Sequence, residues 1–475
     1  MEILNLVRNI LWAVAACLGG VVCARLLFGL YTVAGIAVNA PLNPEGVFGL
    51  LIVVLLLLPL RVPLVRKFEI GPSTTKPSPW PLIALVVGLP VGAFIALSRA
   101  LQVYFVSDDF IIVRLAQRFS SAVFTSPGGD GFFRPLGYVS LAMNAWFAGV
   151  DPGWWHASAL VLHAVNALLV ALLTRRLAGG WVTPLLTGTL FALHGTHLEA
   201  AVWIAGRFDL LAAMFTLATL LLFERNTALA LLCALAALWS KESAYVLPFL
   251  VAILARMEGR PWKRVAPFAG ITAVAFVYRW ALLGGIGGYR ESTGDAAFYS
   301  LKFTTTAKAV FVRLWTSLFF PINWSEDPSW IVGLLGVLYV ATLLWLAWRG
   351  GTSGVRWMLL ALGASILPPL HLLGGSADLS GGRLLYLPSI WFCMLLVAAP
   401  AGLPKRKYLA ASAILVVFHF AAVQHDLGFW IRTSEQVREI CASPTPPANP
   451  PTMIGGVPAL ANGLTECMEL AKRLQ

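Results

Sequence analysis

The chain has 475 residues, of which 59% are hydrophobic and only 12% are charged. Soluble globular proteins carry about 25% charged residues, so this composition excludes a water-soluble protein. The formal net charge of +12 does not indicate nucleic-acid binding, because Lys and Arg stand in short loops between apolar runs, where they encode membrane orientation. We therefore expect membrane lipids as partners and no nucleic acid.

The apolar runs predict an all-α polytopic membrane protein. In lipid only helices and closed barrels satisfy the backbone, and these runs lack the alternating pattern of barrel strands. The first run, "MEILNLVRNILWAVAACLGGVV", has no clear cleavage site, so we expect an uncleaved first helix. Segments of roughly 17 to 25 apolar residues, with some shorter buried ones, give about thirteen spanning helices. They begin at about residues 9, 46, 81, 156, 182, 207, 227, 244, 265, 331, 357, 384 and 408.

The loops between these runs divide by charge. Basic loops such as "TRRLAGG", "RMEGRPWKR" and "PKRK" fall on one side, which is predicted to be cytoplasmic. Large loops at 107–155 and 284–328 and the tail 425–475 then lie on the opposite side. We therefore expect N-terminal helices with a cytoplasmic loop at 1–80, a membrane core at 81–424 and an extracytoplasmic tail.

Two segments on the outer side have their own signals. The segment 298–324 is too polar at its start to span and too apolar at its end to be solvated, which favours an interfacial or re-entrant helix. In the tail, a Pro-rich linker precedes a short final helix. Cys441 and Cys467 flank that linker and could form a disulfide if the tail lies outside the cytoplasm.

Charged side chains beside apolar segments are costly, so each is a candidate functional residue. Asp108 and Asp109 end the third predicted helix. Their repulsion can raise one pKa and produce a proton acceptor, or the pair can cap the next helix; the residues leave both readings open. Arg134 can clamp a phosphate with its planar fork of donors, or pair with an acid. His156 and His163 are more typical of a hydrogen-bonded core.

The stretch "FALHGTHLEAAVWIAGRFDLLAAMF" is the most informative one. It contains five polar side chains at a helix junction: His194, His197, Glu199, Arg207 and Asp209. The spacing differs from the HExxH of zinc peptidases, although two His and one Glu leave a divalent metal as an alternative. We expect a hydrogen-bonded turn beneath a substrate cavity, with no metal or other cofactor required.

The remaining candidates follow later in the chain. Lys241 and Glu242 end a helix on the outer side, where a mutually neutralised pair is the simplest interpretation. Arg279, Arg383 and Tyr386 are expected near the same level. Together, convergent cations and carboxylates could bind a lipid phosphate while an acid takes the acceptor proton.

In this order, the chain contains the acidic pair, Arg-Pro-Leu, the His-rich stretch, "LWSKESAYVLP" and "GRLLYLPSIWF". This series resembles the transmembrane and tetratricopeptide-repeat (TMTC-like) O-mannosyltransferases, their bacterial relatives and protein O-mannosyltransferase relatives. The resemblance covers about residues 107–398 and implies a GT-C glycosyltransferase fold. It implies a polyprenyl-phosphate donor, often of mannose, and inverting transfer to an acceptor outside the cytoplasm, in a bacterium the periplasmic face of the inner membrane. The first-loop acid Asp108 would be catalytic, with Asp109 as second candidate.

The resemblance also has departures and leaves alternatives. Basic residues for the donor phosphate would come from Arg134, Arg207, Lys241, Arg279 and Arg383. Gly195 stands where the family usually has Pro, and Gly382 stands where it usually has Glu, which leaves Arg383 without an adjacent acid. The repeats are absent, so the acceptor (protein, lipid or glycan) stays open. The alternatives are a transporter or flippase of lipid-linked sugar and a non-catalytic assembly protein.

Overall fold

The structure is a computed structural model that describes residues 32–33, 36–37, 79–126, 131–289, 314–323, 325, 355–372, 378–447, 449–460 and 464–474. These residues are mostly helical. The α-helices are α3 (Trp80–Ile83), α4 (Leu89–Ala96), α5 (Asp109–Gln117), α6 (Pro135–Ala148), α7 (Pro152–Ala178), α8 (Val182–Ala192), α9 (Leu198–Ala201), α10 (Arg207–Leu222), α11 (Thr227–Leu238), α12 (Leu247–Met257), α13 (Ala266–Leu283), α15 (Leu314–Phe319), α17 (Val355–Ile366), α18 (Tyr386–Ala398), α19 (Lys405–Ala442) and α20 (Leu464–Leu474).

Short turns of other helix types join these elements. A π-helical segment, η2 (Ala84–Gly88), links α3 to α4. The 3-10 turns are η3 (Ser98–Gln102), η4 (Ser121–Phe124), η5 (Gly195–His197), η6 (Ile204–Gly206), η7 (Glu242–Val246), η8 (Trp262–Arg264), η11 (Leu370–Leu372), η12 (Gly382–Leu385) and η13 (Ala399–Gly402). Two antiparallel pairs of two-residue strands complete the secondary structure: β1 (Thr32–Val33) with β2 (Ile36–Ala37), and β3 (Met453–Ile454) with β4 (Val457–Pro458).

Ten of the predicted spans coincide with helices, beginning with α3 at Trp80 and ending with α19 at Lys405. The predicted spans at 9, 46 and 331 lie outside the described residues, as do much of the outer loop 284–328 and most of the segment 298–324. The described end of that segment forms α15.

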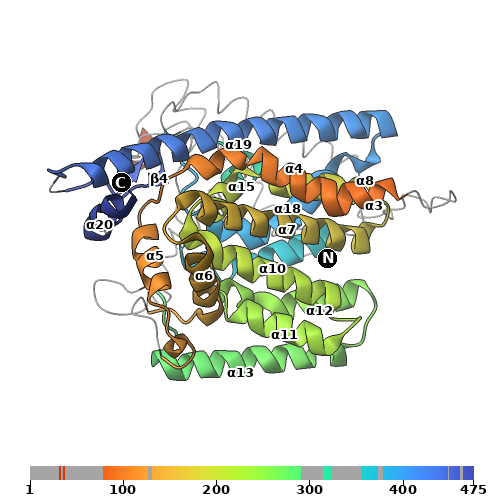
Figure 1. Ribbon diagram of the computed structural model, residues 1–475. Coiled ribbons are helices and arrows are strands. Elements are labelled where there is room, and N and C mark those ends of the chain that lie inside the picture. Colours follow the sequence, from red (N-terminus) through yellow and green to blue (C-terminus); the bar gives the residue numbers. More distant parts are fainter. Residues whose placement is uncertain are drawn as a thin grey trace.

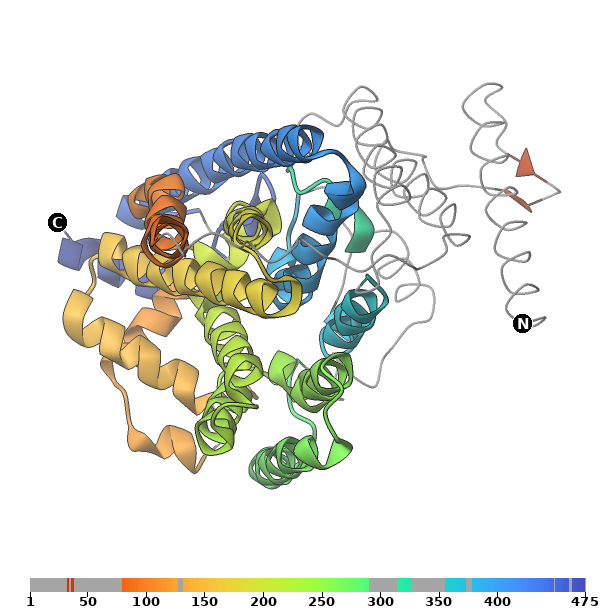
Figure 2. The same ribbon diagram turned by 90° about the vertical axis from the view of Figure 1, so that its right-hand side faces the viewer.

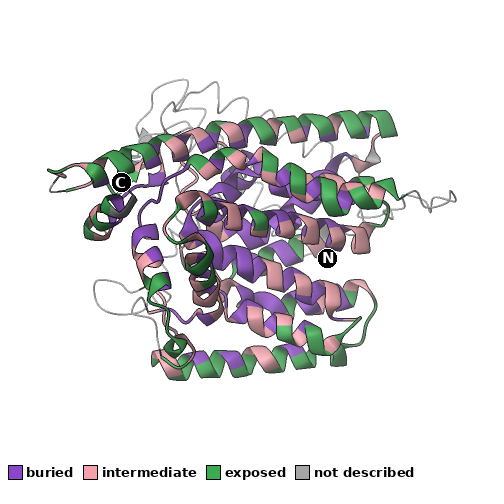
Figure 3. Ribbon diagram, in the orientation of Figure 1, coloured by how far each residue is buried: buried purple, intermediate pink, exposed green. Residues whose placement is uncertain are grey.

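The helices form a bundle in which α10 is central. Helix α10 packs against α7 on one side and α11 on another, and α18 packs against α8 and α17 (Figure 2). The sequence of α10, "RFDLLAAMFTLATLLL", is apolar on almost every face, which is the pattern of a helix surrounded by others. Figure 3 shows that burial is concentrated in these inner helices. The inner helices therefore form a rigid frame for the polar residues at their ends.

The outer helices expose apolar side chains instead. Ile95 of α4, Val274 of α13 and Ile414 of α19 are between 64% and 70% exposed. In the described part of the chain, five helices are long and apolar enough to cross a membrane: Pro152–Ala178, Ile204–Leu222, Trp262–Leu283, Gly382–Ala401 and Lys405–Ala442. Four shorter apolar helices accompany them. The described chain is thus a helical membrane protein with lipid-facing outer helices.

Helix α19 does not end where the predicted tail begins. It has 38 residues, so at about 1.5 Å per residue it is about 57 Å long, whereas a hydrocarbon core is about 30 Å thick. The segment after residue 425 therefore continues the helix, and the non-helical tail starts at Ser443. Helix α19 extends beyond the ends of its neighbours in Figure 1.

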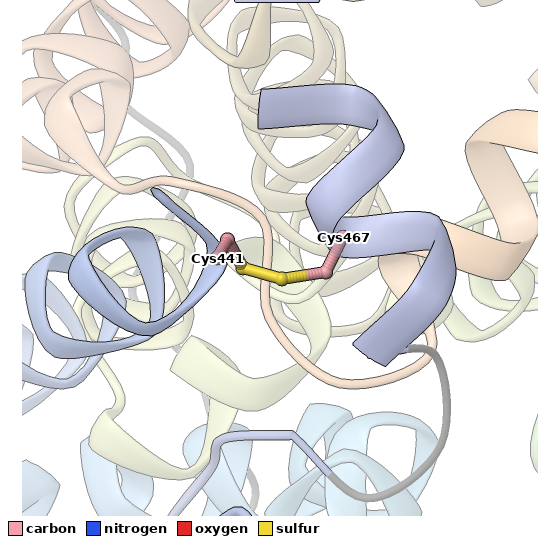
Figure 4. Close-up of a disulfide and its surroundings, with 2 residues drawn as sticks. All are labelled: Cys441 and Cys467. Carbon is pink, nitrogen blue, oxygen red and sulfur yellow. A yellow bond between two sulfur atoms is a disulfide. The ribbon is translucent and has the colours of Figure 1, made fainter. Parts of the chain in front are cut away.

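The rest of the tail folds back onto the bundle. Gly455 and Gly456 have φ of 53° and 77° between β3 and β4, the left-handed backbone that a two-residue hairpin turn requires. After this hairpin, α20 packs against α19 and α5. Cys441 and Cys467 form the expected disulfide, with their Cα atoms 5.4 Å apart (Figure 4). The disulfide thereby ties α20 to the end of α19.

Candidate active site

The adjacent acids Asp108 and Asp109 have different environments. Asp109, at the first position of α5, is fully buried. Its Oδ2 accepts a hydrogen bond from the Val106 amide at 3.1 Å, and its Oδ1 accepts one from the Ala205 amide at 3.3 Å. Burial raises the pKa of Asp109 well above its usual range. Asp109 therefore joins the outer loop to η6, and its oxygens are not available to a substrate.

Asp108 is the partly exposed member of the pair. It precedes α5 but its side chain accepts no capping hydrogen bond, so the capping interpretation does not describe it. Burial raises the pKa of Asp108, while the positive charge of Arg383 and a hydrogen bond from Ser107 act to lower it. A half-buried carboxylate with a raised pKa is suited to accept a proton near neutral pH.

The backbone just before Asp108 is held by the tail. Ser107 has a φ of 51°, an uncommon conformation for a residue with a side chain. Its amide donates to the Ala459 carbonyl oxygen at 2.6 Å. Nearby, Arg114 of α5 forms an ion pair with Glu466 of α20 at 2.9 Å. The tail therefore fixes the segment that carries Asp108.

Arg383 receives its carboxylate partner from a distant element. Glu199 of α9 accepts a hydrogen bond from the Arg383 amide at 2.9 Å, and its other oxygen lies 3.6 Å from Arg383 Nη1. The guanidinium carbon lies 4.2 Å from the centre of the Trp203 ring. Within the described residues the guanidinium itself donates no hydrogen bond, so Arg383 has donors available for an anion.

Close packing around Arg383 and Glu199 explains why Gly195 and Gly382 stand where the sequence comparison led us to expect Pro and Glu. A Cβ on Gly382 would lie 2.7 Å from the Thr196 carbonyl oxygen, so a Glu cannot stand there. A Cβ on Gly195 would overlap the Pro321 carbonyl, so a Pro cannot stand there either. Both positions require glycine because backbone approaches closely. Glu199 supplies the acid that the sequence pattern leaves out beside Arg383.

The other cations are held by carboxylates. Lys241 Nζ lies 2.5 Å from Asp209 Oδ2, with both side chains almost fully buried. Glu242 accepts three hydrogen bonds from Arg134, the shortest at 2.6 Å, and lies 3.5 Å from Arg279. Although burial alone acts to raise the pKa of Glu242, Arg134 and Arg279 lower it. Burial lowers the pKa of Lys241, while the negative charge of Asp209 acts to raise it.

These pairs form one continuous charged layer. Lys241 is within electrostatic range of both Arg134 and Arg383, and Arg134 is within range of Asp209. The layer contains four cations and four carboxylates, one of which is Asp108, so its charges balance when Asp108 is ionised. Arg134 and Asp209 also stand at the starts of α6 and α10, where backbone amides favour anions. We call Asp108, Glu199, Asp209, Lys241, Glu242, Arg134, Arg279 and Arg383 the charged layer.

The remaining predicted residues lie inside the bundle. Arg207 is buried and donates to the Asn144 side chain at 3.0 Å and to the Trp155 carbonyl at 3.1 Å. The rings of His194 and His197 contact the Leu318 and Phe191 carbonyls at 3.0 and 2.7 Å, and the Tyr386 hydroxyl lies 2.8 Å from His163. These side chains support the turn between α8 and α10 from inside the bundle. Among the described residues no three His, Cys, Asp or Glu are placed to hold a metal ion.

A small cavity adjoins the charged layer at Glu199. It is lined by Gly195, Thr196, Leu198, Glu199, Asn323, Asp378, Leu379, Ser380, Asp426, Trp430, Gly456 and Val457. Sequence reasoning missed most of these residues, because they come from five separate segments of the chain. Asp426 carried a signal, since it is an acid that directly follows the apolar run of α19.

The fold and the charged layer define a polytopic helical membrane protein with ordered ion pairs at one end of its helices. No family model matches the chain. The chain is similar to "Protein O-mannosyl-transferase Tmtc1" of Drosophila melanogaster, with 34% identity over 125 residues, 25% of this chain and 15% of that protein. It is also similar to "Protein O-mannosyl-transferase tmtc2" of Xenopus laevis, with 33% identity over 108 residues, 23% and 13% of the two chains.

The human protein O-mannosyl-transferase TMTC2 shows the same relationship, at 31% identity over 108 residues. The matches thus span about a quarter of this chain and less than a sixth of those relatives. They confirm the resemblance to the TMTC proteins.

Proposed function

We propose that this protein is a GT-C glycosyltransferase with about thirteen spanning helices, which moves a sugar from a polyprenyl-phosphate donor to an acceptor hydroxyl. The observation that carries the proposal is a half-buried carboxylate, Asp108, within electrostatic range of Arg383, whose guanidinium has donors available. Mannose as the sugar and a protein hydroxyl as the acceptor are supported by the names of the relatives.

The donor phosphate binds at the charged layer. Arg383 is the first contact, because its guanidinium lies 3.6 Å from Glu199 without a hydrogen bond among the described residues, whereas Arg134 and Lys241 each donate hydrogen bonds to a carboxylate. Those two cations still contribute their field, since a positive charge close to an anion stabilises it even when each cation also has a carboxylate partner. Arg207 is directed into the bundle and has no part in this step.

The reaction is a single displacement. The acceptor hydroxyl oxygen attacks the anomeric carbon, the bond from that carbon to the phosphate oxygen breaks, and the lipid phosphate leaves with the electron pair. Asp108 takes the hydroxyl proton, and Arg383 balances the charge on the departing phosphate. Attack opposite the leaving group inverts the anomeric centre. The step as written uses no metal.

The charged layer lies on the non-cytoplasmic face. The opposite helix ends carry basic residues, including Arg176, which pairs with Glu258 at 2.6 Å and donates to Leu220 at the end of α10. Basic loops mark the cytoplasmic side. The disulfide of Cys441 supports the same orientation, because disulfides persist in oxidising compartments. In a bacterium this face is the periplasmic side of the inner membrane.

Replacing Asp108 with Asn tests the proposal. The variant keeps the size of the side chain but loses the base, so transfer from mannosyl-phosphoryl-polyprenol to a Thr-containing peptide should fall by about 100-fold or more. Asp151→Asn is the matched control: it lies in the same outer loop and caps α7, a role that Asn fills equally well. Near-normal turnover in Asp108→Asn, with the control unchanged, would refute Asp108 as the base.

A further inference from the structure

Arg383 is contacted on two sides by one short stretch of the chain. Glu199 of α9 accepts a hydrogen bond from the Arg383 amide at 2.9 Å, and its other carboxylate oxygen lies 3.6 Å from Nη1. Four residues later, the ring of Trp203 lies against the guanidinium, with its centre 4.2 Å from the guanidinium carbon. Glu199 thus fixes the backbone of Arg383, and Trp203 is the ring against which its side chain rests.

The contact with Trp203 differs from the way in which Arg134 is held. Arg134 also lies over a ring, that of Phe132 at 3.9 Å, but Glu242 accepts three hydrogen bonds from its guanidinium. Among the described residues, the guanidinium of Arg383 has the ring contact without such hydrogen bonds. A cation is attracted to the face of a ring without an acceptor atom, so its N–H groups stay available for an anion.

The turn that carries Trp203 is fixed by several contacts. Trp203 precedes η6, and its carbonyl oxygen accepts a hydrogen bond from the Gly206 amide at 2.9 Å. A Cβ on Gly206 would lie 2.5 Å from the Ala200 carbonyl oxygen, so the two ends of the turn are in close contact. Asp109 accepts a hydrogen bond from the Ala205 amide at 3.3 Å. The buried Asp109 therefore helps to fix the turn on which Trp203 stands.

The burial of the two side chains suits this arrangement. Trp203 is 6% exposed, whereas the side chain of Arg383 is 19% exposed. A contact between a cation and a ring is stronger where water is excluded. The ring is thus a buried support, while part of the arginine remains open to the outside.

We propose that Trp203 is a positioning residue for the donor phosphate: its ring holds the Arg383 guanidinium in place beside Asp108 without using the donors that the phosphate needs. The inference rests on the proposed glycosyl transfer, and it adds a residue that touches neither the sugar nor the acceptor. A flexible arginine would lose conformational freedom on binding the phosphate, whereas one already held by a ring loses less.

Phosphate binding tests this role separately from sugar transfer. The probe is undecaprenyl phosphate without a sugar, titrated into the full-length protein in nanodiscs and followed by native mass spectrometry. Trp203→Leu removes the ring and should weaken binding about tenfold. Trp203→Phe keeps a ring and should stay within about threefold of wild type. Trp262→Leu, an exposed site near the opposite helix ends, is the matched control and should bind as wild type.

A combination with Arg383→Gln distinguishes positioning from a general effect on the fold. Once the cation is removed, the ring has nothing to hold, so adding Trp203→Leu should weaken binding no further. The same tenfold loss in both backgrounds would mean that Trp203 acts through another contact, and it would overturn the proposal. Binding at the wild-type level by folded Trp203→Leu would overturn it as well.

A fluorinated tryptophan at position 203, introduced by nonsense suppression, covers the case in which Trp203→Leu does not fold. Fluorine preserves the shape of the ring but withdraws negative charge from its face, so binding should weaken with each added fluorine, and a flat series would contradict the role of Trp203. If wild type binds the phosphate with this coupling but transfers no sugar, the proposed function fails and the role of Trp203 stands. No binding by wild type would overturn the donor site, and the role of Trp203 with it.

Discussion

The disulfide between Cys441 and Cys467 gives the most quantitative prediction. The bond closes a segment with a sequence separation of 26. In the chain-entropy treatment, closing a loop of this length removes conformational entropy from the opened tail and raises its free energy by about 3.5 kcal/mol. Replacing both residues with Ser should therefore favour detachment of the tail by about 300-fold.

The Ser107 amide is the reporter for this effect, because it donates to Ala459 in the tail. Hydrogen exchange in nanodiscs should show that its protection falls by up to about 300-fold, while amides of α10 keep theirs. Transfer should fall as well, since the segment before Asp108 loses its support. Wild type treated with a reductant should behave like the double variant, and Cys233→Ser, outside the tail, should not.

Two results would refute this reasoning. Unchanged protection at Ser107 would mean that the remaining contacts, such as the Arg114 ion pair with Glu466, hold the tail without the bond. An equal loss of protection in α10 would mean that the disulfide stabilises the whole bundle and has no special relation to the catalytic loop.

Two other predictions concern the charged layer. Since Arg383 lowers the pKa of Asp108, Arg383→Gln should raise that pKa. Transfer requires ionised Asp108, so the acidic limb of the residual pH–rate profile should move to higher pH. An unmoved limb would contradict the assignment of this limb to Asp108. Arg118→Gln, an exposed site at the end of α5, is the control. Asp209→Asn leaves Lys241 buried without its partner and should lower the free energy of unfolding by about 3 to 5 kcal/mol in a denaturation assay. Glu258→Gln, in the more exposed ion pair at the opposite helix ends, should lower it less. Equal losses in the two variants would argue that the charged layer is no drier than that end.

The helices could largely be predicted from sequence, because apolar runs of this length have few alternatives in lipid. Helix α19 is the exception: its continuation past residue 425 depends on packing against the tail, which the local pattern does not show. The candidate residues could also be named, since charges beside apolar runs are conspicuous.

Their roles could not be separated from sequence. Asp108 and Asp109 are chemically identical neighbours, and only the burial of Asp109 against η6 distinguishes them. The partner of Arg383 is Glu199, 184 residues away, and the residues next to Arg383 in the sequence include no acid that could have been predicted to pair with it. Such pairings arise from tertiary structure, so a single sequence carries no direct trace of them.

The docking of the tail has a consequence for the order in which the protein matures. Chains are synthesised from the N-terminus, so the loop bearing Asp108 reaches the membrane long before the hairpin that supports Ser107. Until the hairpin docks, a step that the bond between Cys441 and Cys467 favours, the Ser107 amide lacks its acceptor in the tail and the cavity lacks the wall formed by Val457. Catalytic competence would then be the last property the protein acquires, coupled to the oxidation of a single pair of thiols after its helices are in place.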